Sequence, residues 1–397
     1  MLIFLTGFLL IYGLMQGYFY LRLNAAVPLR GWWRAAVLLW LALMLPAPLL
    51  IRVLERADLH GPAMIIAYGG YLWMGALFLF CVVALWLDCW RLLATGMVML
   101  WRRLAAAVRP AGGLPAATIA GRLGSLGSPR AIFLAAGLFA LAASGYGYWE
   151  AQQIRLERVV ITSNKLAPGQ PPIRLVQISD VHLGLIVGPE RLARMLAVVR
   201  EAAPDILVST GDLVDGQSDG LNGSAALFSQ IEPRLGKYAV LGNHEFYVGV
   251  EQSLEFHRQA GFTVLRGAAA TVAEGLVIAG VDDQTGIALG LTPADQEERL
   301  RETLLADNLN LLLKHQPRSA GPGRVDLQLS GHVHQGQIVP FNLLVKLAHP
   351  VGMGLTQAGE GEYLYVNRGT GTWGPPIRFL ASPEVTLIEL RPAPPAP

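Results

Sequence analysis

The sequence has very little cysteine for a chain of its length. Its 397 residues include only Cys81 and Cys89, both within one apolar stretch. On a single helix, residues eight apart lie too far from each other for a disulfide. No cysteine follows Glu150. That part of the chain therefore has no thiolate nucleophile, no cysteine-type zinc site and no disulfide scaffold.

Charge is also scarce. Charged residues make up 15% of the chain and hydrophobic residues 53%, with a mean hydropathy of +0.41. The net charge of +2 gives no indication of a nucleic-acid partner. Because the long uncharged runs precede residue 151, we expect a transmembrane region at 1–150 and a second domain at 151–397.

Four apolar segments predict membrane-spanning helices: 2–21, 35–51, 63–87 and 131–149. No basic residue precedes the first, so we expect a retained helix rather than a cleaved signal peptide. None of the four contains an ionisable residue that would mark a transport path, which favours an anchor over a transporter. A buried helical core in a soluble protein is the alternative, and the flanking arginines and aromatic residues disfavour it.

The distribution of arginine predicts an orientation. Segment 91–130 contains six arginines and no acidic residue, and the connection between the first two spans adds Arg22, Arg30 and Arg34. Cytoplasmic loops carry an excess of basic residues, so both connections are expected in the cytoplasm. With four spans, the domain at 151–397 is then extracytoplasmic, whereas a further span at 92–100 would reverse this.

After Glu150, short β-branched runs alternate with amphipathic helical patterns, which predicts a layered α/β domain. A helix is expected at 189–203, and another is expected to begin at Thr292-Pro293. The expected strands are 173–179, 206–209, 238–241, 276–279, 309–313 and 325–329. In such domains ligands bind at the carboxyl ends of the strands.

Polar motifs follow five of these strands. They are Asp180-Val181-His182, Gly211-Asp212, Gly242-Asn243-His244-Glu245, Lys314-His315 and Gly331-His332-Val333-His334. A bare His-x-His is more often a surface turn than a ligand pair. Scattered core histidines would not all follow strands, however, so the motifs together predict a metal site.

The predicted donors are carboxylates, imidazoles and one amide carbonyl. This mixed set suits Mn, Fe, Zn or Co better than Ca or Mg alone. There are too many donors for one ion, but enough for two ions about 3.5–4 Å apart with a shared carboxylate, an arrangement used in phosphoryl displacement. Glycines precede Asp212, Asn243 and His332, where they would let the backbone pass close to the ions.

In this order, the motifs resemble those of the calcineurin-like metallophosphoesterase superfamily, over about residues 173–390. The stretch from Tyr365 through Arg378 to Val385 resembles a membrane-associated bacterial branch called YkuE-like. The resemblance implies a β-sandwich of two mixed sheets flanked by helices, with a dinuclear metal site. Together with the four expected spans, it predicts a multi-pass protein of the bacterial inner membrane.

The resemblance implies that one ion is held by Asp180, His182 and His334. It implies that the other is held by Asn243, His315 and His332, and that Asp212 bridges the two ions. It makes His244 the catalytic residue that protonates the leaving oxygen or stabilises the transition state. Because His244 directly follows Asn243, it cannot easily bind the same ion and is free for acid catalysis. Arg318 stands where this branch usually has an acidic residue, which would alter substrate preference. Arg368 is a candidate for binding a substrate phosphate, and a structural salt bridge is an equally good interpretation.

Other polar residues have less specific interpretations. Asp215 and Glu245 are expected to orient ligands or the loop backbone. Asp282 and Asp283 are expected to be solvated turn residues, and His257 a surface residue of a helix. Segment 340–355 is unusually apolar for a loop beside a metal site. Core packing is its simplest interpretation, and the alternative is that it dips into the bilayer or guides a lipid tail toward the metals.

We therefore expect a membrane-anchored, metal-dependent phosphohydrolase of phosphodiesters or pyrophosphates, acting on a cell-envelope or lipid-linked substrate. A UDP-2,3-diacylglucosamine pyrophosphatase of the lipid A pathway is an alternative, disfavoured by the arginine distribution because that substrate is cytoplasmic. An inactive membrane sensor or scaffold is disfavoured because no ligand type is missing. The substrate and the oligomeric state do not follow from the sequence.

Overall fold

The computed structural model describes residues 2–108, 127–215, 221, 223–319, 321, 323–359 and 361–394. It divides into two compact units: Met1–Val53 with Ile66–Tyr146, and Leu54–Ile65 with Gly147–Pro397. Part of the predicted arginine-rich loop, including Arg109 and Arg122, lies outside the described residues.

Five helices, most of them strongly apolar, make up nearly all of the described residues before the first strand. They are α1 (Leu2–Ala26), α2 (Gly31–Met44), α3 (Ala47–Arg56), α4 (His60–Val108) and α6 (Pro129–Glu150). Phe19 of α1, Phe80 of α4 and Phe133 of α6 pack together, with ring centroids 5.0 Å apart for Phe19 and Phe80 and 5.4 Å apart for Phe80 and Phe133. The break between α2 and α3 falls at Pro46, because proline lacks the N–H that would continue the helix.

The described residues confirm apolar helices of spanning length but not the predicted number of four. His60–Trp101 and Pro129–Glu150 are long and apolar enough to cross a membrane, and the bent pair of α2 and α3 makes three if it forms one span. The predicted loop at 91–130 is wrong in its first part, because α4 remains helical to Val108. At 1.5 Å per residue, the 42 residues from His60 to Trp101 extend about 63 Å, roughly twice the thickness of a hydrocarbon core.

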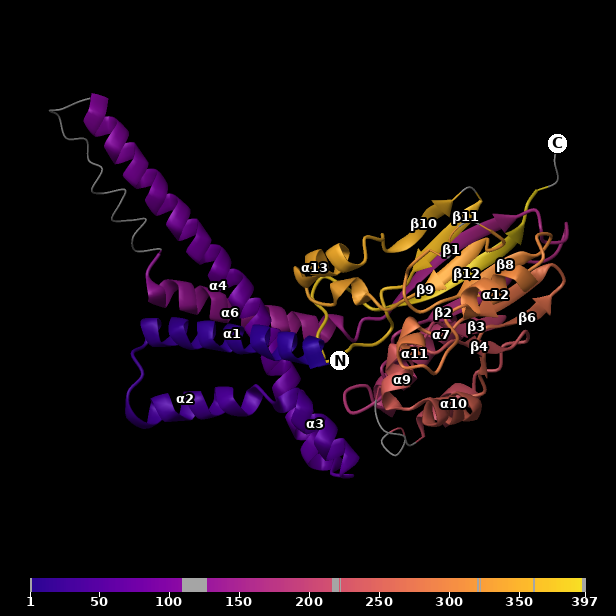
Figure 1. Ribbon diagram of the computed structural model, residues 1–397, viewed down its shortest axis with the longest axis horizontal. Helices are drawn as coiled ribbons and strands as arrows, with labels where there is room; N and C mark the ends of the chain where they lie inside the picture. The colour runs from indigo at the N-terminus through magenta and orange to yellow at the C-terminus, as the bar shows by residue number, and fades with distance from the viewer. Residues whose placement is uncertain are drawn as a thin grey trace. The chain divides into compact units, whose positions relative to one another are not determined.

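Two six-stranded sheets lie in the second unit (Figure 1). The first has the order β1 (Arg155–Ser163), β12 (Glu384–Pro392), β2 (Ile173–Ile178), β3 (Ile206–Ser209), β4 (Lys237–Ala239) and β5 (Thr263–Val264). The second has the order β10 (Gly354–Gly359), β11 (Glu362–Val366), β9 (Leu327–Ser330), β8 (Leu309–Leu313), β7 (Leu276–Gly280) and β6 (Ala268–Ala273). Antiparallel and parallel pairs occur in both, which confirms the prediction of two mixed sheets.

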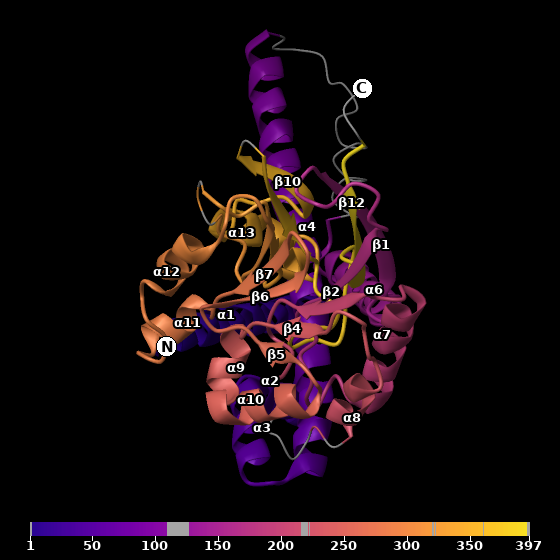
Figure 2. The same ribbon diagram turned by 90° about the vertical axis from the view of Figure 1, so that its right-hand side faces the viewer.

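The core lies between the sheets and on their outer faces. Leu175 and Val208 of the first sheet pack against Ile278 and Leu311 of the second. The outer face of the first sheet packs on α7 (Pro189–Glu201), α8 (Ser224–Ser229) and α10 (Val250–Gln259), and that of the second packs on α12 (Gln296–Thr303). Figure 2 shows α12 and α7 on opposite sides of the paired sheets. Strands buried on both faces have nearly continuous apolar sequences, as β3 and β8 do, with Ser209 and Asn310 as their only polar residues.

The predicted strands are confirmed to within two residues at each end. One predicted helix start is wrong, since α12 begins at Gln296 rather than at Thr292. The reason is that the hydroxyl of Thr292 donates to Asp282 at 2.7 Å instead of capping a helix. Strands β2, β3 and β4 are parallel neighbours, as are β8 and β9, so each group brings its carboxyl ends to one edge.

Candidate metal centre

The predicted ligands converge at the carboxyl edge of both sheets. Asp180 follows β2, Asp212 follows β3 and His315 follows β8. Three overlapping groups have their ligand atoms within 4.8 Å of one another: Asp180, His182 and His334; His182, Asp212 and His244; and Asp212, His315 and His332. Because the groups share His182 and Asp212, they form one continuous cluster.

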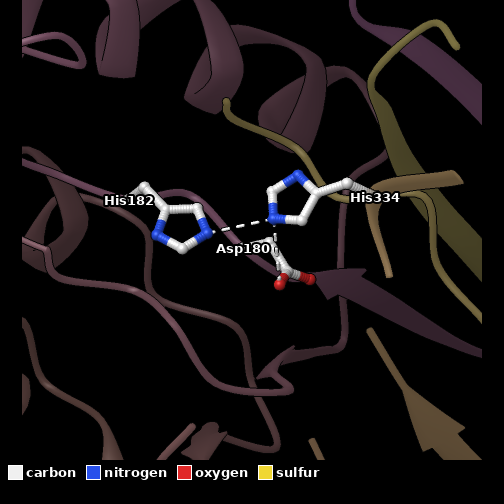
Figure 3. A group of neighbouring side chains, drawn as sticks. All are labelled: Asp180, His182 and His334. Carbon is white, nitrogen blue, oxygen red and sulfur yellow. Dashed lines mark hydrogen bonds and ion pairs between the residues drawn. The ribbon is translucent and has the colours of Figure 1, made fainter. Parts of the chain in front are cut away.

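The first group joins Asp180, His182 and His334 (Figure 3). Nε2 of His182 lies 3.0 Å from Nε2 of His334, which lies 3.4 Å from Oδ1 of Asp180. The backbone N–H of His332 donates to both carboxylate oxygens of Asp180, at 3.0 and 2.9 Å. Burial favours the neutral carboxyl, but His334 and the other histidines outweigh burial and hold the pKa of Asp180 well below its usual range.

The third group, which Asn243 joins, centres on Nε2 of His315. It lies 3.1 Å from Oδ2 of Asp212, 3.1 Å from Oδ1 of Asn243 and 3.2 Å from Nδ1 of His332. Nδ1 of His315 lies 2.8 Å from the carbonyl oxygen of Thr210. That oxygen can only accept, so Nδ1 carries a proton and Nε2 of the neutral ring turns its lone pair toward the other groups.

Two oxygen acceptors, Oδ2 of Asp212 and Oδ1 of Asn243, thus lie against the lone pair of Nε2, an arrangement that favours positive charge. A proton on Nε2 of His315 satisfies one acceptor at a time. Burial opposes that proton, but Asp212 outweighs burial and raises the pKa of His315 well above its usual value. A divalent cation that accepts oxygen and imidazole ligands satisfies the whole donor set, so these residues fit a metal ion.

The backbone at the cluster is strained. Five of the seven predicted ligands have left-handed φ angles: Asp180 (52°), His182 (54°), Asp212 (53°), His332 (71°) and His334 (47°). Such residues cost about 1–3 kcal/mol each and are kept only where the surroundings determine the conformation. A Cβ added at Gly242 would overlap the carboxylate of Asp212, and one added at Gly331 would overlap Ser179 and Asp180. These two glycines therefore permit the close approach that the sequence predicts.

His244 lies at the border of the cluster. Its Nδ1 lies 2.7 Å from Oδ1 of Asp215, and its Nε2 lies 4.0 Å from Oδ2 of Asp212. Since the Asp215 carboxylate accepts, Nδ1 carries the proton and Nε2 faces the cluster. The exposed rings of Tyr247 and Trp373 flank the imidazole at centroid distances of 5.6 and 5.8 Å. His244 thus lies between the buried ligands and the surface.

Glu245 holds two loops of the site together. Its buried carboxylate accepts four backbone N–H bonds, from Asp212 (2.9 Å), Leu213 (2.7 Å), Val214 (3.2 Å) and Gly242 (2.8 Å). Burial and the nearby Asp212 raise the pKa of Glu245 to about 7, while the N–H bonds oppose that rise. This geometry agrees with the predicted role of orienting the loop backbone.

Three residues predicted at the surface are buried. Asp282 forms an ion pair with Arg266 at 2.8 Å, and Asp283 caps α11 (Gln284–Ala288). His257 packs inside, and its Nδ1 donates to the carbonyl of Ser253 at 2.7 Å. These predictions were wrong because the tertiary fold determines which residue each of the three contacts and which helices or strands cover it.

Arg368 is paired rather than directed at the cluster. Its guanidinium forms ion pairs with Glu384 and Glu157, which agrees with the structural interpretation of this residue. Burial disfavours its charge, but Glu384 outweighs burial and raises its pKa above the usual value. The geometry gives no support to a phosphate contact by Arg368.

Arg378 belongs to the site but was not among the residues predicted for it. Its fully buried guanidinium donates to the carbonyls of Gly371 (2.7 Å), Arg368 (2.8 Å) and Ala381 (3.0 Å). It also lies 3.1 Å from Nδ1 of His334. Burial lowers the pKa of Arg378 to about 9. A lone charge between Ile377 and Phe379 is the sequence signal that could have found it.

The apolar segment at 340–355 forms helix α13 (Phe341–Ala348). Val345, Val351 and Met353 pack partly against Val333 and its neighbours. None of the helix residues is buried, and Leu347 is 82% exposed. Core packing therefore explains the side of the helix that carries Val345, and it does not explain the exposed leucines.

Comparisons with known proteins agree with this site. Residues 173–336 match the family model of the calcineurin-like phosphoesterases. The chain is 40% identical over 256 residues to an uncharacterized metallophosphoesterase of Aquifex aeolicus, covering 64% of this chain and 97% of that one. It is 35% identical over 279 residues to the uncharacterized metallophosphoesterase YkuE of Bacillus subtilis, covering 65% and 93%.

A vertebrate protein is also similar. The transmembrane protein with metallophosphoesterase domain of Danio rerio is 34% identical over 256 residues, which cover 61% of this chain and 59% of that protein. This chain therefore spans less than two thirds of that relative. Together with the geometry, the match to nearly the whole Aquifex protein shows that the chain belongs to the calcineurin-like metallophosphoesterase family, a family of metal-dependent phosphoric ester hydrolases.

Proposed function

We propose that this protein is a membrane-anchored phosphohydrolase that cleaves phosphodiester or pyrophosphate bonds with two divalent metal ions. The observation that carries the proposal is the position of Asp212 between two groups of ligands. Its Oδ2 lies 3.9 Å from Nε2 of His182 and 3.1 Å from Nε2 of His315. One carboxylate can therefore serve both groups.

The proposed ligands are divided between the two ions. One ion would be held by Asp180, His182 and His334, the other by Asn243, His315 and His332, and both by Asp212. The mixed donor set favours Mn, Fe or Zn. When bound, two such ions would lower the pKa of water for attack on phosphorus and neutralise charge on the phosphoryl oxygens.

His244 is the proposed catalytic residue. The bond from its Nδ1 to Asp215 fixes the ring, so Nε2 is the atom that meets the substrate. The imidazolium form of His244 carries a second proton on Nε2. When the bond between phosphorus and the leaving oxygen breaks, that proton would pass to the oxygen, and the ring would keep the Nδ1 proton bound to Asp215. Tyr247 and Trp373 restrict the space around the ring and would limit the access of bulk water to it.

We further propose that residues 1–150 anchor the protein in a bacterial inner membrane and that 151–397 form the catalytic domain. Four spans result if the 25-residue helix α1, the bent pair of α2 and α3, helix α4 and helix α6 each cross the membrane once. The catalytic domain would then be extracytoplasmic, and a cell-envelope or lipid-linked phosphoester would be the substrate. The relative from Danio rerio, named as a transmembrane protein, supports the membrane location.

The proposal can be tested on the full chain in detergent. Metal-stripped protein is assayed on bis-p-nitrophenyl phosphate and on p-nitrophenyl phosphate, before and after addition of Mn²⁺, Fe²⁺ or Zn²⁺. Metal-dependent cleavage of the diester is expected. If the metal-loaded protein cleaves neither these esters nor a pyrophosphate, the proposed activity is wrong.

A further inference from the structure

Helix α13 carries an apolar face directed at solvent. Leu343 and Leu344 precede Leu347 by four and three residues, so the three leucines share one side of the helix. Their exposed fractions are 60, 56 and 82%. Lys346 is the one charged residue of the helix. No aspartate or glutamate occurs from 327 to 359. An apolar face with a basic residue and no acidic one is typical of helices that lie in a membrane interface.

Both ends of α13 are fixed to the candidate metal centre. At its start, the backbone of Asn342 lies so close to Gly336 that an added Cβ there would overlap it. At its end, the ring of His349 lies 5.2 Å from that of His332. Gly336 closes the turn η2 (His334–Gly336), so the start of the helix packs on the turn that holds His334 and its end packs on His332.

The segment before α13 is linked to the end of a candidate membrane span. The backbone N–H of Val339 donates to the carbonyl of Phe379 at 3.1 Å. The next residue, Leu380, donates its N–H to the carboxylate of Glu150 at 2.8 Å, and Glu150 is the last residue of α6. Two hydrogen bonds thus connect the exit of α6 to the entry of α13.

Aromatic and apolar side chains surround this connection. Trp149 in the last turn of α6 is 55% exposed, and Leu380 is equally exposed. Trp373, whose backbone N–H donates to the side chain of Gln337 at 2.9 Å, lies beside the same segment. Tryptophan is enriched where membrane proteins meet the lipid headgroups, so this part of the catalytic unit has the composition of an interface.

We propose that α13 inserts its apolar face into the surface of the lipid bilayer, with Leu343, Leu344 and Leu347 at the boundary of the acyl chains. Lys346 then reaches the lipid phosphates. The metal centre therefore opens at the membrane surface, and substrates with a lipid tail reach it from the plane of the membrane. This consequence for substrates rests on the proposed function, whereas the insertion of α13 does not.

The insertion is measured with one fluorescent label on the full chain. Cys81→Ala and Cys89→Ala remove the native thiols, and Leu347→Cys carries an environment-sensitive fluorophore in nanodiscs that contain phosphatidylglycerol and doxyl-labelled lipid. Leu305→Cys is the matched control, because Leu305 is also an exposed leucine (64%) but lies between α12 and β8. Lipid-borne quencher is expected to quench the label at 347 several-fold more than at 305, and aqueous iodide to do the reverse.

Equal quenching at the two positions would overturn the insertion. So would a signal at 347 that depends on the number of protein copies per disc rather than on the lipid quencher, since a second copy would then cover the helix. The measurement needs neither metal nor turnover. The same quenching is expected with Asp212→Asn, so the result separates the insertion of α13 from the proposed activity.

The consequence for substrates has its own test. The triple variant Leu343→Ser, Leu344→Ser and Leu347→Ser is assayed on dodecyl and on methyl p-nitrophenyl phosphate, which share a leaving group and differ in the tail. We expect a several-fold loss on the dodecyl ester and little change on the methyl ester. An equal loss on both would overturn the lipid route, and no hydrolysis of either by the wild-type protein would count against the proposed function instead.

Discussion

Nδ1 of His244 lies 2.7 Å from Oδ1 of Asp215, and this contact determines which ring nitrogen faces the metal cluster. The carboxylate can only accept, so it holds a proton on Nδ1 and turns Nε2 toward the cluster. The backbone N–H of His244 donates to Asp212 at 2.9 Å, which fixes the position of the ring relative to the proposed bridging ligand. The pair therefore links a candidate acid to the candidate metal centre.

Removing the imidazole is expected to separate catalysis from metal binding. His244→Ala should keep the metal content of the wild-type protein and lower kcat by about 10²–10⁴, the usual contribution of a positioned acid. Metal content by mass spectrometry and kcat for a phosphodiester are measured on the same sample. Loss of bound metal would instead assign His244 as a ligand, and an unchanged kcat would remove it from the chemistry.

The carboxylate of Glu245 is expected to stabilise the fold. Glu245→Gln replaces an anion that accepts four N–H bonds with an amide whose NH₂ group meets backbone donors. The free energy of unfolding should fall by about 1–3 kcal/mol, as for other buried groups left without a partner.

Glu255→Gln is the matched control, because Glu255 is an exposed residue of α10 that pairs with Arg258. Its effect on stability should be clearly smaller than that of Glu245→Gln, because solvent screens an exposed ion pair. Circular dichroism during denaturant unfolding gives both values. If the two substitutions lowered the free energy of unfolding equally, the four N–H bonds of Glu245 would not stabilise the fold more than an exposed ion pair does.

Close packing at Gly331 is expected to reject even one methyl group. A Cβ there would overlap Ser179 and Asp180, so Gly331→Ala must displace a proposed ligand and should lower metal affinity and activity by about 10-fold or more. Gly188→Ala is the control, because no atom lies within 4 Å of a Cβ added there. Metal titration of both variants checks this, and normal affinity in Gly331→Ala would contradict the geometry.

Buried His257 predicts a dependence of stability on pH. Burial lowers its pKa to about 4, whereas an unfolded chain has the usual value near 6.5. Between these values the unfolded state binds the proton more readily. This residue's contribution is therefore complete above pH 6.5 and is lost as the pH falls toward 4, by up to about 1.4 kcal/mol per pH unit.

The variant His257→Asn can still donate to the carbonyl of Ser253 but does not titrate. Between pH 7.5 and pH 4.5, the wild-type protein should therefore lose more of its unfolding free energy than the variant does. Parallel profiles for the two proteins would mean that His257 is not buried as the neutral form.

Much of the site could be predicted because its signals are local. β3 occupies 206–209 as predicted, and Asp212 follows it in a motif that a short window contains. The role of Arg378 was missed, because its carbonyl partners come from three separate loop positions and the sequence marks it only as an isolated charge between Ile377 and Phe379. The extent of α4 was misjudged because arginine ends an apolar run without ending a helix, having a high helix propensity. The environment of His257 likewise depends on elements distant in sequence.

The most direct test of the account is the hydrolysis of bis-p-nitrophenyl phosphate by Asp212→Asn, with the metal content of the same sample measured per chain. Asp212 lies between both ligand groups, so loss of its negative charge should weaken metal binding and abolish metal-dependent hydrolysis. Wild-type protein should hold two ions per chain and cleave the diester. Unchanged metal content together with full activity in Asp212→Asn would contradict the assignment of a two-ion centre bridged by this residue.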